Sequence, residues 1–264
     1  MKGLLNISIL ILSLSVRAAV FLDLKLKDNS RVKGELIEVY EDRWFYQEQN
    51  KTTQKFVLLY NEKNKEPYFE FHNINKISKV KVTKFSKSKY KKYLKRNNLI
   101  FKNKLVKNAA VLTGNEGHHK HEKMYGNFAW DIGILNEEGS QFKNSGNVLE
   151  DFFIFDQDVV SPLEGTVVGK VSDQEDNAPD LSFQSSLEGK VNNYLTIHLT
   201  GPFYLSIVHF KKDSIKVNIG DKVKVGDFLG TVGNSGVSYL PHLHYTLYIY
   251  VKEHDRFISV PGFF

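Results

Sequence analysis

Hydrophobic and polar residues alternate along most of this 264-residue chain, a pattern typical of strands that bury one face. In residues 20–83, short alternating runs are separated by polar turns such as Asp28-Asn29-Ser30. This spacing predicts a small all-β module, similar in pattern to an SH3- or Sm-type barrel. After residue 108, helical periodicity is almost absent and glycines mark the turns. We therefore expect a mainly β protein, in which an antiparallel sheet or sandwich over residues 108–264 follows the small module at 20–83.

The N-terminus has a different pattern. A short charged start, Met1-Lys2, precedes an apolar run from Leu4 to Val16 and then Arg17-Ala18-Ala19. This order is typical of a secretory signal peptide. The run is shorter than the ~20 residues that a spanning helix needs, so cleavage is favoured over an uncleaved anchor. We expect residues 1–19 to be a signal peptide, the mature protein to be periplasmic, envelope-bound or extracellular, and no stable transmembrane anchor.

Charge is distributed unevenly along the sequence. Residues 76–107 contain thirteen Lys and Arg and no Asp or Glu, so the rest of the chain sums to −7 although the total is +6. Within 84–107, Tyr90, Tyr93 and Leu94 have helical spacing, which predicts a short helix in a basic linker. The segment is either a solvated linker or an attachment site for an anionic envelope polymer or lipid headgroup. Export makes nucleic acid the least expected partner.

Cysteine is absent from the sequence. Its absence excludes disulfides, thiolate zinc sites and a cysteine nucleophile, so a metal ion here must be held by His and Asp or Glu. The sequence also has no H-E-x-x-H motif, no G-x-S-x-G motif and no phosphate-binding loop. The common alternative classes of hydrolase and nucleotide-binding protein therefore lack support.

Two histidines stand two residues apart at the start of a predicted strand. His242 and His244 follow Pro241 and precede an apolar run from Tyr245 to Val251. Residues i and i+2 of a strand point to the same face, so the two rings would enter one cleft together. This arrangement suits a metal site or acid–base chemistry, whereas surface histidines are usually scattered and structural ones usually stand alone.

A carboxylate in an apolar strand is the second candidate. Asp131 lies between Trp130 and Ile132 and needs a cation, a backbone donor or a metal as partner. A histidine-dense loop precedes it, with histidines at positions 118, 119 and 121. These residues extend the predicted site beyond the histidine pair.

Five motifs occur in order in the C-terminal half: Ser161-Pro162-x-x-Gly165-x-Val167, Asn193-Tyr194-x-x-Ile197, Tyr204-x-x-x-x-His209-Phe210, the glycine-cornered run from Val217 to Gly236, and Pro241-His242-Leu243-His244. Together they resemble the lysostaphin-type (LytM-like) zinc metallopeptidases, which cut peptide bonds in bacterial cell walls. The resemblance covers about residues 110–250. It implies one zinc ion per chain, held by a histidine and Asp131 from the first motif and by His244.

The resemblance also implies roles for the other histidines. His242 and His209 match the family's non-ligand histidines, one of which would transfer the proton while the other helps to hold the developing oxyanion. The first motif departs from the simplest H-x-x-x-D form, because Asn127 stands four residues before Asp131. His121 is our choice for the first zinc ligand, with His119 and His118 as alternatives.

Two functions follow as expectations. The first is an exported zinc metalloendopeptidase that hydrolyses peptide bonds of peptidoglycan stems or cross-bridges. The second, motivated by Asn127, is a catalytically degenerate envelope protein that keeps the fold to bind peptidoglycan or to activate another cell-wall hydrolase. A secreted peptidase acting on proteins would differ from the first only in substrate. The loops at 135–158 and 172–190, which would wall the cleft, carry no readable specificity code.

Overall fold

The computed structural model describes residues 18–42, 54–101, 104–113 and 126–262. The described residues form two compact units. The first comprises the chain up to Asn97 together with Val251–Asp255, and the second comprises Asn98 to Tyr250 and the residues from Arg256 onward. The predicted signal peptide at 1–19 lies outside the described residues except for its last two positions. In the described part of the chain, no helix combines the length and the apolar character needed to cross a bilayer.

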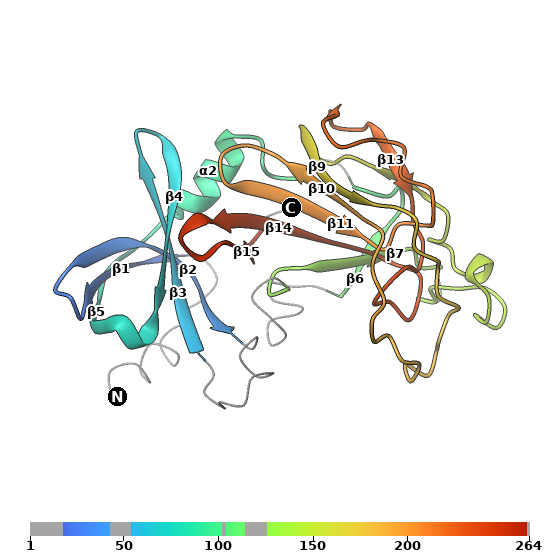
Figure 1. Cartoon of the computed structure of the whole chain (residues 1–264), viewed down its shortest axis with the longest axis horizontal. Coiled ribbons are helices and arrows are strands. Elements are labelled where there is room, and N and C mark those ends of the chain that lie inside the picture. The colour runs from blue at the N-terminus through green and yellow to red at the C-terminus, as the bar shows by residue number, and fades with distance from the viewer. Residues whose placement is uncertain (1–17, 43–53, 102–103, 114–125, 263–264) are drawn as a thin grey trace. The chain divides into compact units, whose positions relative to one another are not determined.

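The first unit is built on a five-stranded antiparallel sheet in the order β4-β3-β2-β1-β5 (Figure 1). Its elements are β1 (Ala19–Leu26), β2 (Arg31–Asp42), β3 (Gln54–Lys63), β4 (Glu66–Asn73), a short 3₁₀ helix (Ile74–Lys76), β5 (Ile77–Ser86) and α2 (Lys89–Arg96). Leu22, Leu24 and Leu26 of β1 point to one face and join a core with Val57, Leu59 and Ile77. The alternating pattern of β1 produces this division, because every second residue of a strand faces the same way.

Helix α2 lies in the middle of the segment predicted to be a basic linker. Ser88 caps its N-terminus by accepting a hydrogen bond from the Lys91 N–H at 2.8 Å. Tyr90, Tyr93 and Leu94 are buried, and the Tyr90 ring packs edge-on against Tyr60 of β3. The helix therefore packs on the first unit rather than standing free in solvent, and its lysines are exposed.

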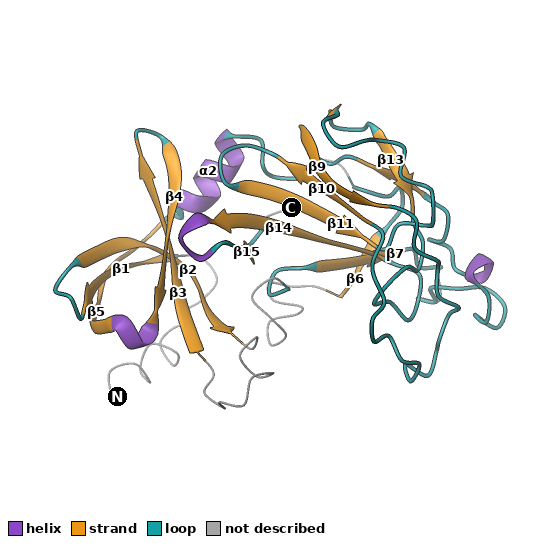
Figure 2. Ribbon diagram, in the orientation of Figure 1, coloured by secondary structure: helices purple, strands orange, loops and turns teal. Residues whose placement is uncertain are grey.

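The second unit contains an eight-stranded antiparallel sheet, in which β12-β9-β10-β11-β14-β7-β6 are neighbours in that order and β15 pairs with β14 (Figure 2). A separate pair, β13-β8, packs with it. The bounds are β6 (Ala110–Thr113), β7 (Trp130–Gly133), β8 (Asp158–Val160), β9 (Gly165–Val171), β10 (Tyr194–His198), β11 (Phe203–Val208), β12 (Lys222–Val223), β13 (Phe228–Thr231), β14 (Leu243–Val251) and β15 (Arg256–Ser259). A short 3₁₀ helix lies at Leu149–Asp151, and another, at Lys252–His254 between β14 and β15, belongs to the first unit.

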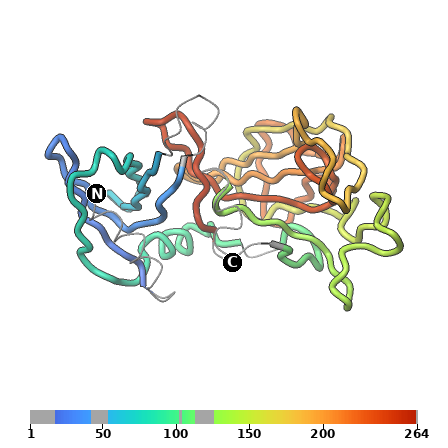
Figure 3. Tube along the Cα trace, turned by 90° about the horizontal axis from the view of Figure 1, so that it is seen from below, coloured from blue at the N-terminus to red at the C-terminus, as the bar shows by residue number. Residues whose placement is uncertain are grey.

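Alternating apolar residues of the central strands fill the core of the second unit. Leu195, Ile197, Leu205, Ile207 and Leu243 are completely buried. The trace of this part of the chain runs from green through yellow to red in Figure 3. The mainly β, antiparallel fold predicted from the sequence is confirmed.

Candidate metal centre

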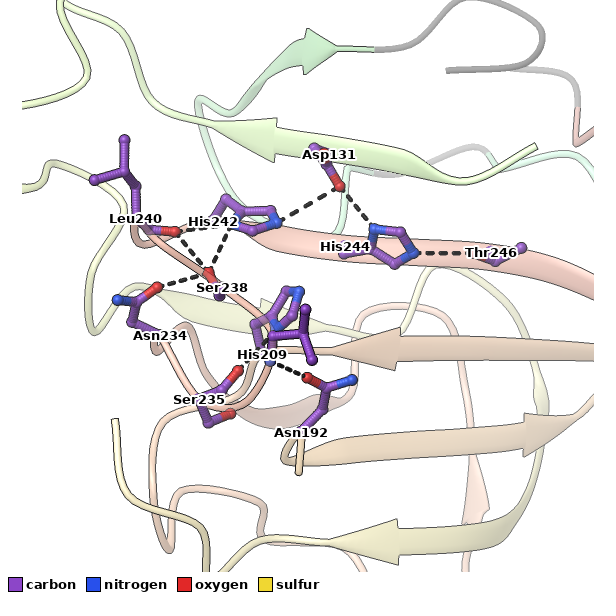
Figure 4. A network of polar contacts seen from close by, with 11 residues as sticks. Asp131, Asn192, His209, Asn234, Ser235, Ser238, Leu240, His242, His244 and Thr246 are labelled. Carbon is purple, nitrogen blue, oxygen red and sulfur yellow. Dashed lines mark hydrogen bonds and ion pairs between the residues drawn. The ribbon is translucent and has the colours of Figure 1, made fainter. Parts of the chain in front are cut away.

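Neighbouring strands of the second unit bring Asp131, His242 and His244 together (Figure 4). The register of β14 against β7 places His244 directly opposite Asp131. Residues directly opposite in an antiparallel pair point to the same face, so the two side chains meet. His242 precedes β14 by one residue and lies on the same side, as the i, i+2 spacing predicts.

His244 contacts a polar atom with each ring nitrogen. Its Nδ1 lies 2.8 Å from Asp131 Oδ1, and its Nε2 lies 3.4 Å from Thr246 Oγ1. Thr246 is 1% exposed, so this hydroxyl belongs to the interior of the sheet. When Nδ1 donates its hydrogen to Asp131, the Nε2 of the neutral ring accepts from the threonine hydroxyl. When the Nδ1 lone pair binds a cation instead, Nε2 carries the hydrogen and donates it to the threonine oxygen, which fixes the orientation of the ring.

The tautomer of His242 follows from its neighbours. Nδ1 lies 2.8 Å from the Leu240 carbonyl oxygen, which only accepts, and 3.2 Å from Ser238 Oγ. Nδ1 therefore carries the hydrogen in the neutral ring, and the Nε2 lone pair is left for the site. Nε2 lies 3.6 Å from Asp131 Oδ1.

His209 has the same tautomer but a more enclosed position. It is 4% exposed, and its Nδ1 donates to the Ser235 carbonyl oxygen at 2.8 Å. Burial, with His242 and His244 close by, lowers the pKa of His209 well below its usual range, so the ring is neutral near pH 7. The site thus holds a neutral imidazole with an unprotonated Nε2.

The backbone at His209 is unusual. Apolar residues alternate along the sequence from Phe203 to Phe210, but β11 ends at Val208 and His209 has a φ of 71°, in the left-handed region. Its N–H donates to the Asn193 carbonyl at 2.9 Å, and its own carbonyl accepts from the Gly233 N–H at 2.8 Å. These bonds hold a conformation that a non-glycine residue adopts only at a cost.

Asn193 links the segments beneath His209. Its side-chain amide donates to the carbonyl oxygens of Phe210 and Gln174, at 3.0 and 2.8 Å. Its backbone N–H donates to Ser235 Oγ at 3.0 Å, and Asn193 is completely buried. The asparagine therefore fixes both the turn that carries His209 and the segment whose carbonyl orients its ring.

The loop at 172–190 is hydrogen-bonded to the segment before His242. Asn177 Nδ2 donates to the carbonyls of Gly236 and Ser238, at 2.7 and 3.0 Å, and the Asp180 N–H donates to the carbonyl of Tyr239 at 2.9 Å. Gly236 has a φ of 75°, and a Cβ there would lie 2.5 Å from Asn192 Cα, so only glycine fits this crossing. The loop expected to wall a cleft is thus joined to the histidine-bearing segment.

The donor set at this centre fits zinc. One ring nitrogen from each of His209, His242 and His244 lies within 4.8 Å of the others, and Asp131 Oδ1 lies 2.8 Å from His244 Nδ1. The His209 ring centroid lies 4.6 Å from that of His242 and 6.0 Å from that of His244. Neutral imidazoles and a carboxylate are the ligands that zinc takes where thiolates are absent.

The structure does not describe every residue of the predicted site. His118, His119 and His121 lie outside the described residues, so the choice among them stays a prediction. Asn127, in the position of the simplest first-motif histidine, is 5% exposed in the turn before β7.

Sequence reasoning missed the residues that hold the histidines. Ser235 and Asn193 act through contacts between segments far apart in the sequence, and no spacing signals these. Ser238 lies only four residues before His242, whose ring its hydroxyl contacts. Thr246 was detectable, because it continues the i, i+2 series that begins at His242 and His244.

The chain is similar to known proteins over the region that contains the three histidines. Residues 151–256 match the model of peptidase family M23, a span that includes His209, His242 and His244 but not Asp131. A protein of Buchnera aphidicola (subsp. Baizongia pistaciae), described as an uncharacterized metalloprotease, is 43% identical over 63 residues. The match covers 24% of this chain and only 16% of the length of that relative.

Two solved structures resemble the chain with low sequence identity and low TM-scores. The catalytic domain of a prophage-encoded M23 protein from Enterococcus faecalis is 19% identical, with 60% of this chain and 94% of that chain covered and a TM-score of 0.37. A zinc-containing peptidase from Vibrio cholerae is 12% identical, with 91% and 78% covered and a TM-score of 0.35.

Proposed function

Because residues 151–256 form a peptidase M23 domain, and members of that family are typically zinc metalloendopeptidases acting on peptidoglycan, we propose that this protein is an exported enzyme of that kind. Its substrates would be peptide bonds in the stem peptides or cross-bridges of peptidoglycan. The observation that carries the proposal is the convergence of three histidines and Asp131 at one point of the sheet.

We assign metal binding to Asp131 and His244, together with a histidine of the loop that contains positions 118–121. Asp131 Oδ1 lies 2.8 Å from His244 Nδ1, and Thr246 Oγ1 lies 3.4 Å from His244 Nε2. A zinc ion bound there supplies a Lewis acid that polarises a carbonyl group and makes water more acidic.

His209 and His242 would then move protons. Both rings are held with hydrogen on Nδ1 by backbone carbonyls, so each presents an unprotonated Nε2. One histidine accepts the proton of the attacking water and delivers it to the leaving amine. The other histidine, in its protonated form, donates a hydrogen bond to the oxyanion. The lowered pKa of His209 keeps that ring in the neutral, proton-accepting form.

The test uses purified protein on isolated sacculi. We expect about one zinc ion per chain and the release of peptides with new amino termini, abolished by a chelator and by His244→Ala. Parallel assays on a glycine-rich peptide, a cross-linked muropeptide and a denatured protein would separate a cell-wall peptidase from a general one. A metal-free protein that binds sacculi without cutting them would contradict the proposal and favour the degenerate alternative.

A further inference from the structure

One face of the first unit collects cationic side chains from three neighbouring strands and the helix. We call this surface the basic face; it consists of Lys25, Arg31, Lys33, Lys79, Lys81, Lys84 and Lys89, all of them exposed. Strands β2, β1 and β5 lie side by side in the sheet and supply six of the seven residues. Lys89 is the first residue of α2, and its Nζ lies over the ring of Phe21 in β1, as does that of Lys84.

The strand register places like charges directly opposite each other. Lys25 of β1 pairs with Arg31 of β2 on one side and with Lys79 of β5 on the other. Directly opposed side chains in an antiparallel sheet are close neighbours, and like charges at such positions destabilise the sheet. A row of three cations across three strands therefore costs folding stability.

Two carboxylates lie beneath this surface, and both already have partners. Asp23 is 6% exposed and accepts hydrogen bonds from Arg31 Nη2 and Nε, at 2.7 and 3.1 Å, with Lys33 Nζ 3.5 Å away. Glu35 is 3% exposed and accepts from the backbone N–H groups of Lys89 and Tyr90, at 2.7 and 3.0 Å. Seven cations against two engaged carboxylates leave a surplus of positive charge for an external anion.

The same face lacks exposed large apolar side chains among the described residues. In the first unit, Tyr68 and Phe85 are the exposed large hydrophobic residues. Phe85 pairs with Val20 and Tyr68 pairs with Asn61, positions that alternate with the charged rows and so point to the opposite side. A surface that inserts into a bilayer usually presents apolar residues among its cations, so this face is better suited to a hydrated anion.

We propose that the basic face binds a linear polymer that carries repeated phosphate groups. Arg and Lys are the side chains that proteins use for phosphate, and strands spaced by about 4.8 Å present them as a regular array rather than as a single site. A chain with many phosphates can contact several rows at once and release counterions as it binds. The proposal does not depend on the peptidase function, because the residues of the metal centre take no part in it.

The experiment measures binding of long-chain inorganic polyphosphate to the full mature chain. The test variant is Lys25→Gln, Lys79→Gln and Lys81→Gln, which leaves the pair of Arg31 and Asp23 intact. The matched control is Lys190→Gln, Lys222→Gln and Lys224→Gln, exposed lysines of the second unit with the same total charge. We expect the test variant to raise the Kd at least about tenfold and to flatten its dependence on salt, and the control to change it by less than about twofold.

Further arms identify the source of the phosphate groups. Poly(glycerol phosphate) and duplex DNA, compared at equal phosphate concentration, separate a cell-wall polymer from nucleic acid. Vesicles of phosphatidylglycerol and phosphatidylcholine test the membrane. Absence of polyphosphate binding, equal weakening by both triple variants, or binding to the vesicles alone would overturn the proposal. Thermal unfolding of the test variant should be unchanged or shifted upward, because the substitution removes opposed like charges.

Discussion

The metal centre and the basic face both concentrate polar groups, but the two regions differ in whether these groups have partners within the protein. At the metal centre, His209, His242 and His244 each have a partner for a ring nitrogen, supplied by a carbonyl oxygen or a carboxylate. At the basic face, Lys25 lies between two other cations, and the nearby carboxylates are already engaged. The first region orients its groups, whereas the second leaves its charge to be neutralised from outside.

The difference teaches what each region can bind. A partly buried, hydrogen-bonded cluster with fixed lone pairs suits one small cation in a defined position. An exposed array of lysines suits an extended anion whose exact position matters little. Substitutions should therefore have sharp, residue-specific effects at the metal centre and shallow, charge-dependent effects at the basic face.

The largest effect is expected for His244→Ala. Removal of an assigned metal ligand should abolish both zinc binding and peptide release from sacculi, and a chelator should do the same to the unaltered protein. Metal content by mass spectrometry and peptide release check the two outcomes. His198→Ala, at a histidine of β10 that contacts the Gly201 carbonyl, is the control and should retain zinc and activity. A His244→Ala variant that keeps its metal would refute the assignment.

His209→Gln should separate proton transfer from metal binding. We expect activity to fall by about 10²–10⁴-fold while the zinc content stays near one per chain, because His209 is assigned to the proton rather than to the metal. Loss of the metal in this variant would instead indicate that His209, His242 and His244 form the ligand set.

Thr246→Val should act through His244. The valine keeps the volume but removes the hydroxyl beside Nε2, and we expect zinc affinity to fall by about 10–100-fold. Thr246→Ser should restore most of the loss, which a purely steric role of the threonine would not produce. Competition with a chromogenic chelator measures the affinity of all three proteins.

Glu35→Ala tests the carboxylate beneath the basic face. The change leaves two N–H groups at the start of α2 without their acceptor, which should cost about 1–3 kcal/mol in the first unit. Amide hydrogen exchange should rise in residues 89–96, while zinc content stays unchanged. Unaltered exchange in the helix would show that the carboxylate does not stabilise it.

The smallest effect is expected for Lys79→Gln. This substitution removes the like-charge pair with Lys25, so the free energy of unfolding should rise slightly, by about 0.2–1 kcal/mol at low salt. The gain should shrink as salt screens the repulsion. Urea denaturation at two salt concentrations measures both; a loss of stability would mean that the opposed cations are already compensated.

The sequence predicted the fold class well, because alternation determines which face of each strand is buried. It also predicted that His242 and His244 share one face and that Asp131 needs a partner, since these inferences depend on the pleat and on the cost of burying a charge. It could not predict the turn at His209, because the alternating pattern continues past the residue where the strand ends. Nor could it predict that Asn193 and Ser235 meet, because that contact depends on strand pairing over long distances.

The left-handed backbone at His209 has a consequence for how such a domain would decay over evolution. With a φ of 71°, the position tolerates glycine and asparagine far better than valine or isoleucine. A lineage that had given up peptide hydrolysis but kept the fold would therefore drift toward glycine or asparagine at this site. The residue at that position in divergent homologues would then indicate whether selection still maintains the histidine.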